Sequence, residues 1–171
     1  PAFVMKMARW DERPHSWDID ERYRGGLGMA LALQGSGVAN IDVASVEIRL
    51  GDDGNYTLYT GSSDMGMGAN TILTQMACEA LGCPMESMTV VESDTDIVPF
   101  DPGSYASSTT YVTGTAAKMA AEELREKIIH KLAQFMDVKP EDIDFDGLVG
   151  TTKDGTKKMS VQELAPKLLV G

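Results

Sequence analysis

The chain has 171 residues, of which 43% are apolar and 24% are charged, and its formal net charge at pH 7 is −11. This composition is typical of a globular protein and excludes disorder over most of the length. The acidity excludes nucleic acid and anionic membranes as partners, because either partner requires a basic surface.

The setting of the chain is inferred from its two ends and its two cysteines. The sequence begins at Pro1, and it ends at Gly171 directly after a helical pattern. We therefore expect a fragment of a larger protein. Cys78 and Cys83 match no zinc or redox spacing, so we expect reduced, buried thiols and a cytoplasmic location. No stretch approaches the ~18 consecutive apolar residues of a membrane span.

The first part of the chain is predicted as an N-terminal arm, residues 1–24, followed by a domain over residues 25–171. The arm mixes aromatic and charged residues without a clean period. The glycine-rich run from Arg24 to Gly37 indicates tight packing, but no strand precedes it and it is no dinucleotide fingerprint. Alternation then predicts strands over 43–50 and 56–60, which the turn sequence Gly-Asp-Asp-Gly-Asn joins into a hairpin.

The rest of the domain alternates helices with short strands. Helical spacing of apolar residues predicts a helix from Asn70 to Leu81, which Gly82 and Pro84 end. A strand over 88–92, a loop over 93–103 and a longer helix over 114–136 follow. The end is a smaller unit, with a strand over 143–149 broken at Gly147, a hairpin turn at 153–155, a capping box from Ser160 to Glu163, and a final helix. We predict an α+β fold of two layers, with helices on one face of a mixed sheet and the order β-β-α-β-α-β-β-α.

Side chains that commonly carry chemistry are sparse. The two histidines, His15 and His130, lie far apart and beside no carboxylate cluster, so we predict no metal site made of protein ligands. No nucleophile elbow is present around any serine. Asp94 and Asp96 have two interpretations, a site for a cation or an amino group and a solvated turn.

Two loops of small residues stand out, Thr60–Asn70 and Asp101–Gly114. Each is rich in Gly, Ser, Thr or Ala, and each precedes a predicted helix. Free N–H groups at a helix N-terminus attract anions, and glycine lets the backbone approach a ligand closely. We therefore expect both loops to converge on one large, polar, anionic ligand, although plain turns explain each loop alone.

In this order and spacing, the loops resemble those of the molybdenum hydroxylases, the family of xanthine dehydrogenases and aldehyde oxidases. The resemblance covers nearly the whole chain and is most specific in the paired loops. It rests on residues 24–30, the Ser63–Gly68 loop, the helix segment 75–82, the pairs Asp94-Thr95 and Val98-Pro99, residues 103–108 up to Gly114, and the ending from Pro140 to Ala165.

The resemblance implies a molybdopterin-binding role for the two loops. Met65, Gly66, Met67 and Gly68 would contact the pterin and its phosphate end. Ala106, Ser107, Ser108 and Thr109 would lie along the pterin near the metal, and Tyr105 and Ala106 would face the substrate pocket. Many relatives carry glutamine where Met67 stands, so here a thioether replaces a side chain that hydrogen-bonds the cofactor, and Met67 is expected to pack on the pterin instead.

The family's glutamate base has no counterpart in this sequence, so we predict no catalytic residue here and no activity for the fragment alone. The resemblance places iron–sulfur clusters and FAD on other domains or subunits. It implies as partners the rest of the molybdopterin-binding domain, those electron-transfer modules and a purine or aldehyde-like substrate. Two alternatives remain at this point: an acidic module that binds a nucleotide or phosphate without redox chemistry, and a domain for subunit packing.

Overall fold

The computed structural model describes residues 2–36 and 41–169. Three residues named in the predictions lie outside that part of the chain: Pro1, Gly37 and Gly171. The chain divides into two compact units, residues 1–34 and 35–171, which are described one at a time. No helix in the described ranges is long and apolar enough to cross a membrane.

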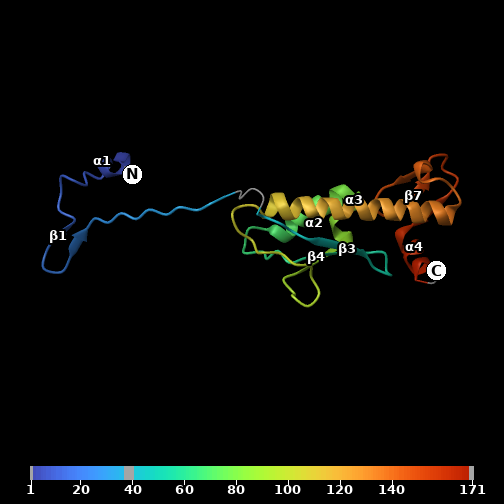
Figure 1. Ribbon diagram of the computed structural model, residues 1–171, viewed down its shortest axis with the longest axis horizontal. Helices are drawn as coiled ribbons and strands as arrows, with labels where there is room; N and C mark the ends of the chain where they lie inside the picture. Colours follow the sequence, from blue (N-terminus) through green and yellow to red (C-terminus); the bar gives the residue numbers. More distant parts are fainter. Residues whose placement is uncertain (1, 37–40, 170–171) are drawn as a thin grey trace. The chain divides into compact units, whose positions relative to one another are not determined.

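The first unit is a short helix followed by a hairpin (Figure 1). Helix α1, Ala2–Met7, buries none of its side chains. Strands β1 (Ser16–Asp18) and β2 (Arg24–Gly26) pair antiparallel. A Cβ on Gly25 would lie 2.3 Å from the ring of Trp17, so the indole packs directly on this glycine. The predicted division between residues 24 and 25 stays a prediction.

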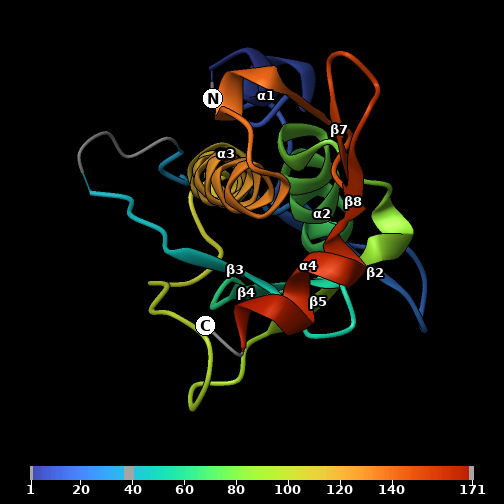
Figure 2. The ribbon, with the colours of Figure 1, turned by 90° about the vertical axis from the view of Figure 1, so that its right-hand side faces the viewer.

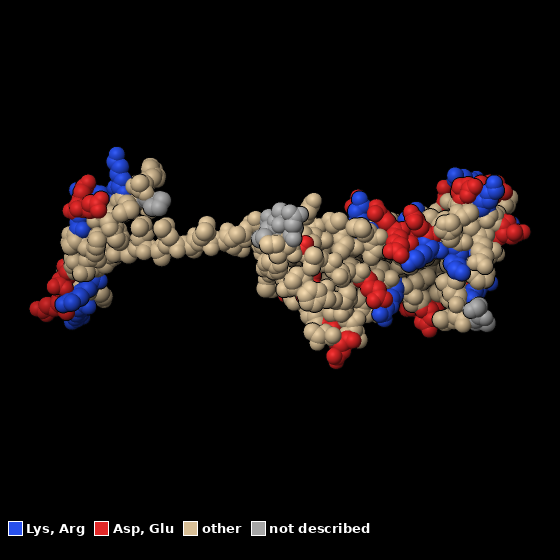
Figure 3. All heavy atoms as spheres, viewed as in Figure 1, with Lys and Arg blue, Asp and Glu red and all other residues tan. Residues whose placement is uncertain are grey.

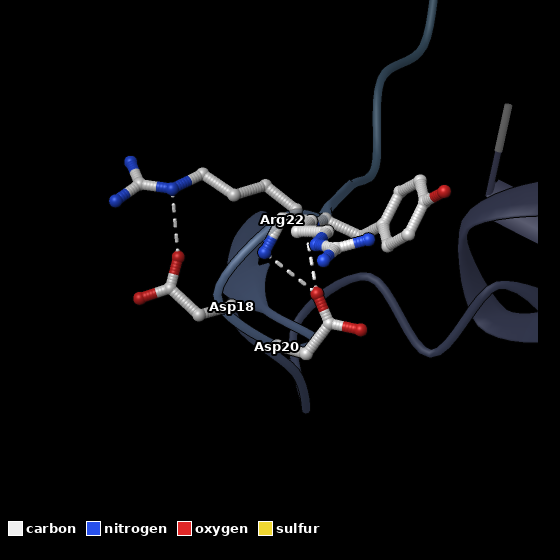
Figure 4. Close-up of polar contacts among 5 residues, drawn as sticks. Asp18, Asp20 and Arg22 are labelled. Atoms are coloured by element: carbon white, nitrogen blue, oxygen red, sulfur yellow. Dashed lines mark hydrogen bonds and ion pairs between the residues drawn. The ribbon is translucent and has the colours of Figure 1, made fainter.

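A carboxylate holds the turn between β1 and β2 (Figure 4). Asp20 Oδ1 accepts hydrogen bonds from the N–H groups of Arg22 at 2.7 Å and Tyr23 at 2.9 Å. Nearby, Arg24 Nε lies 2.8 Å from Asp18 Oδ1. Because that ion pair is well exposed it adds little stability, and the shape of the turn rests mainly on Asp20.

The second unit begins with a three-stranded mixed sheet in the order β3-β4-β5. Strand β3 (Val46–Leu50) pairs antiparallel with β4 (Tyr56–Thr60), with Ile48 opposite Leu58. Strand β5, Met88–Glu92, pairs parallel with β4, and helix α2, Ala69–Leu81, crosses between them. The β4-α2-β5 unit places the connection after β4, residues 61–68, at one end of the sheet.

One long helix spans the second unit (Figures 1 and 2). Helix α3, Thr109–Met136, packs on α2 and β3, and both helices lie on the same face of the first sheet. Its second half packs on an antiparallel sheet of β6 (Ile143–Phe145), β7 (Val149–Thr152) and β8 (Lys158–Ser160). Helix α4, Val161–Leu168, closes the unit. Single 3-10 turns, Met85–Ser87 and Pro140–Asp142, precede β5 and β6.

The core of this unit joins both sheets through the helices. Its fully buried large side chains include Tyr56, Leu58, Leu73, Leu81, Leu132 and Leu164. Tyr56 donates its hydroxyl proton to the carbonyl of Gly147 at 2.6 Å, and burial raises the pKa of this phenol. The Arg125 guanidinium donates to the carbonyls of Leu81 and Phe145, and so ties α2 and α3 to β6. The second unit therefore folds around one continuous core.

The predicted α+β class is confirmed, and the predicted order of elements is not reproduced. The segment 143–149 is two strands rather than one, because Gly147 turns the chain at φ +90° between β6 and β7. With β8 the smaller unit has three strands, one more than predicted. They form a sheet of their own, so the two predicted layers contain two sheets rather than one mixed sheet.

The long helix begins five residues earlier than predicted, at Thr109 instead of Gly114. A Cβ on Gly114 would lie 2.5 Å from Met76 Sδ, so this glycine allows close packing of α3 against α2 rather than starting the helix. At the end of the helix Met136 is buried and Phe135 is exposed. The local sequence of residues 109–113 is typical of a loop, and packing of α3 against α2 makes this segment helical.

Candidate functional site

The loop after β4 is shaped by two left-handed glycines and one carboxylate. Gly66 has φ +97° and Gly68, the N-cap of α2, has φ +78°, conformations that residues with a Cβ rarely adopt. Asp64 Oδ1 accepts hydrogen bonds from the N–H groups of Gly66 at 2.8 Å and Gly68 at 3.2 Å, and its Oδ2 accepts from Asn70 at 3.4 Å. These bonds, Gly66 foremost, lower the pKa of Asp64.

The anion site predicted at the start of α2 is not present in the expected form. The sequence predicts free N–H groups here that could bind an anionic ligand. In the structure Asp64 already accepts from Gly66, Gly68 and Asn70, so these three groups are satisfied within the protein. The loop can still offer its glycine backbone and its apolar side chains to a ligand.

The second loop, which leads into α3, has left-handed residues with side chains where the first loop has left-handed glycines. Ala106 and Ser107 adopt left-handed backbone angles, φ +53° and +57°, just before the helix. The Ser108 hydroxyl donates to the carbonyl of Tyr105 at 3.0 Å, and this N-cap side chain does not cap the first turn of α3. Left-handed angles at residues with side chains carry strain, which is a feature of functional sites.

Serine hydroxyl groups join the two loops at their bases. Ser104 Oγ donates to the carbonyl of Ser63 at 2.8 Å and lies 3.2 Å from Ser62 Oγ, which is buried. Ser63 Oγ lies 3.0 Å from the Oγ of Ser93, the residue that directly follows β5. A Cβ on Gly61 would lie 2.6 Å from the carbonyl oxygen of Pro99, so the backbones also meet closely. The two loops are therefore neighbours in space.

The residues predicted to bind a cofactor differ in exposure. Met65 is 71% exposed and Met67 is 44% exposed, and the N–H of Met65 donates to Met67 Sδ at 3.2 Å. In the second loop Tyr105 is 41% exposed, Ala106 is buried, Ser107 is exposed, and two residues are half-buried, Ser108 and Thr109. Apolar tips over a hydrogen-bonded base are suited to a flat organic group.

The sequence analysis missed the residues that hold this region together. The sequence pattern places three of these residues within the small-residue loops and indicates no separate role for them: Asp64, Ser62 and Ser104. A signal for Asp64 was present, because an aspartate two residues before a glycine often accepts from the backbone of a turn. The serine contacts join residues about forty positions apart, and nothing in the local sequence indicates such pairs.

The stretch of chain that contains the loops carries acidic side chains, including Asp64 and Asp101 within the loops, but no basic ones. No Lys or Arg occurs between Arg49 and Lys118, a stretch that includes both loops. On the face shown in Figure 3, charged side chains of the second unit gather over the later part of α3 and the C-terminal elements. Within residues 2–36 and 41–169, no cluster of three His, Cys, Asp or Glu side chains is placed to hold a metal ion. The loops therefore offer no basic side chain of their own to an anionic ligand.

The local geometry fits a flat cofactor lying against the first loop. A Cβ built on Gly66 or Gly68 would meet no atom within 4 Å, and the same holds for Gly103 in the second loop. The glycine backbone is thus open on the side where a side chain would project.

Comparison with known proteins identifies the family. The family model of the molybdopterin cofactor-binding domain matches residues 4–170. This chain belongs to that family. The match confirms the resemblance to molybdenum hydroxylases and favours it over an acidic nucleotide-binding module, for which no support is found.

Relatives of this cofactor-binding domain are large enzymes or enzyme subunits. A probable hypoxanthine oxidase from Escherichia coli (strain K12) is 40% identical over 132 residues, which are 77% of this chain and 13% of the relative. A putative xanthine dehydrogenase molybdenum-binding subunit from the same organism is 33% identical over 72% of this chain and 17% of its own. The chain therefore spans less than a fifth of either relative.

Solved structures show the same fold. The reconstituted CO dehydrogenase from Oligotropha carboxidovorans superposes with a TM-score of 0.66 at 28% identity, over 73% of this chain and 16% of that one. A Cu,Mo-CO dehydrogenase in its carbon monoxide-reduced state gives the same TM-score at 26% identity, over 78% of this chain and 18% of that one. Most of the cofactor-binding domain thus has a counterpart of known structure.

Proposed function

We propose that this chain forms one wall of the molybdopterin site in a molybdenum-dependent hydroxylase of the xanthine dehydrogenase or aldehyde oxidase type. The observation that carries the proposal is the pair of loops, bonded to each other through Ser104 and Ser63, with open glycine backbone at Gly66 and Gly68. Membership of the cofactor-binding family supports molybdopterin as the ligand of these loops.

In this proposal the two loops hold different parts of the cofactor. Met65–Gly68 provides backbone and thioether contacts to the pterin, with Met67 packing on the ring. Ala106–Thr109 lies along the pterin nearer the metal, and Tyr105 with Ala106 borders the substrate pocket. When bound, the molybdenum cofactor supplies the redox chemistry by which a carbon atom is hydroxylated with oxygen from water. The residues of this chain position the cofactor and exclude water from its ring.

The remaining functions belong to other parts of the enzyme. The glutamate base, the iron–sulfur clusters and the FAD are placed on other domains or subunits, which are this chain's partners together with the rest of the cofactor-binding domain. Residues 25–171 act as the cofactor-positioning part and residues 1–24 as an arm. The names of the relatives favour a purine such as hypoxanthine or xanthine as substrate, with an aldehyde as the second candidate. The cysteine usage favours a cytoplasmic enzyme.

A matched pair of glycine substitutions tests the proposal. Gly68 and Gly155 have similar left-handed angles, φ +78° and +71°, and a Cβ on either one meets nothing within 4 Å. Asparagine tolerates this conformation, so Gly68→Asn and Gly155→Asn each add a side chain with little strain. We expect the molybdenum and pterin content of the full-length enzyme to fall several-fold in Gly68→Asn only, because the added side chain occupies the space of the cofactor.

The outcome is measured on purified full-length enzyme, with metal analysis for molybdenum and fluorescence of the oxidised pterin. Equal occupancy in the two variants and the wild type would contradict the proposal. A complementary experiment uses the isolated chain, which we expect to bind no molybdopterin tightly because the rest of the site is missing. Recovery of a stoichiometric complex of the fragment with the cofactor would contradict that expectation.

A further inference from the structure

Asp64 accepts three hydrogen bonds from the backbone of the first loop. Its carboxylate accepts from the N–H groups of Gly66 and Gly68 through one oxygen, and from that of Asn70 through the other. Both glycines are left-handed, and glycine has the largest conformational freedom to lose on ordering. Without these bonds the loop would sample many shapes.

A second carboxylate fixes the start of the same loop. The N–H of Asp64 donates to Glu92 Oε2 at 3.0 Å, and Glu92 is the last residue of β5. The first loop is therefore tied to the end of the sheet at Glu92 and folded back on its own carboxylate at Asp64. Hydrogen bonds to a charged acceptor are about twice as strong as neutral ones, so both ties are effective even in a half-buried place.

We propose that Asp64 is a positioning residue that forms the Met65–Gly68 loop before any cofactor arrives. Its carboxylate uses the inward N–H groups of the loop and turns the outer side of Gly66 and Gly68 toward the ligand. The effect on cofactor binding rests on the function proposed above, whereas the effect on loop shape does not. A preformed loop spares the ligand the entropic cost of ordering it.

The experiment compares three variants of the full-length enzyme. Asp64→Ala removes all three acceptor bonds. Asp64→Asn keeps a neutral oxygen that can accept from Gly66 and Gly68, and so should rescue part of the effect. Asp154→Asn is the matched control, because Asp154 also accepts a backbone N–H within a turn, that of Thr156 at 3.0 Å, in the C-terminal sheet.

Two readouts are needed. Hydrogen exchange of the peptide covering residues 64–71 is measured by mass spectrometry on enzyme produced without cofactor, with a peptide from the middle of α2 as internal reference. We expect exchange in 64–71 to become at least about tenfold faster in Asp64→Ala, given the strength of bonds to a charged acceptor, while the reference is unchanged. Molybdenum occupancy of the loaded enzyme should fall in the order wild type, Asp64→Asn, Asp64→Ala, and should be unchanged in Asp154→Asn.

Three results would overturn the proposal: unchanged exchange in Asp64→Ala, full occupancy in Asp64→Ala, or an equal loss of occupancy in Asp154→Asn. The last result would mean that any weakened turn lowers occupancy. If the wild-type enzyme contains no molybdopterin, the proposed function fails. The exchange of the cofactor-free enzyme then still decides whether Asp64 shapes the loop.

Discussion

Two turns of this chain use the same local chemistry in different surroundings. In the first, Asp64 accepts from loop N–H groups beside left-handed Gly68; in the second, Asp154 accepts from Thr156 beside left-handed Gly155. The second turn joins β7 to β8 among exposed lysines. The first is bonded to another loop and presents exposed methionines. A tight glycine turn is therefore a candidate site only when its neighbours, such as a second loop and exposed apolar side chains, can contact a ligand.

The largest expected effect comes from comparing Gly66, in the first turn, with Gly147, another left-handed glycine, which lies between β6 and β7. A Cβ on Gly147 would lie 2.4 Å from backbone atoms of Cys83 and Gly82, whereas a Cβ on Gly66 would meet nothing within 4 Å. We expect Gly147→Ala to lower the free energy of unfolding by about 3 kcal/mol or more, from strain and overpacking together. Gly66→Ala should cost about 1–2 kcal/mol, from backbone strain alone.

Urea unfolding of the purified chain, followed by circular dichroism, measures both values. Equal losses in the two variants would mean that the backbone at Gly147 has room to move. The effect on stability would then not distinguish the packed glycine of the structural turn, Gly147, from the open glycine of the candidate site, Gly66.

The next effect concerns the link between the two sheets. Arg125 donates to the carbonyls of Leu81 and Phe145, and its guanidinium lies 5.2 Å from the centroid of the Phe145 ring. Arg125→Met should lower the free energy of unfolding by about 2–3 kcal/mol, because two carbonyls lose a charged donor. Arg125→Lys should recover only part of this loss, since an ammonium lacks the forked geometry. Wild-type stability in the lysine variant would show that the fork is unimportant.

A third prediction concerns high pH. Burial raises the pKa of the Cys83 thiol from 9.0 to about 12, and it also raises the pKa of Cys78. The folded state thus keeps protons that the unfolded chain releases, so stability is fully present below about pH 9 and declines as the pH rises toward 12. Unfolding free energies measured over this range should decline less steeply in Cys83→Ala. An identical decline would mean that Cys83 does not contribute.

The smallest effect is expected at the C-terminal turn in acid. Hydrogen bonds to Asp154, first from the Thr152 hydroxyl, lower the pKa of its carboxyl from 3.8 to about 2. Its contribution to stability is present above about pH 4 and is lost as the pH falls through 2. Because this turn is exposed, Asp154→Asn should change the acid unfolding midpoint only slightly. A large shift in that midpoint would show that the turn is as important to stability as the core.

The sequence was sufficient to predict those elements that depend only on neighbouring residues. The hairpin of β3 and β4 follows from alternation around Gly51–Asn55, and α2 from apolar spacing ended by Gly82. The capping box at Ser160 and Glu163 is present as predicted. Each of these features is determined by residues within a few positions of one another.

Features that depend on distant contacts were missed. Helix α3 starts at Thr109, and Gly114 within it packs against Met76, a contact between residues far apart in the sequence. The hydrogen bond from Ser104 to Ser63 also joins residues far apart in the sequence. For the candidate site, sequence reasoning found the two loops but assumed free N–H groups at α2, where Asp64 already accepts. The competition between a side chain and a ligand for the same donors was not visible from residue types alone.

The most direct test of the central claim is a structure of the full-length enzyme loaded with its cofactor. We predict that the pterin lies within van der Waals distance, about 4 Å, of the backbone at Gly66–Gly68 and of residues 106–109 at once. A pterin that touches only one of the loops, or lies on another face of the domain, would contradict the account.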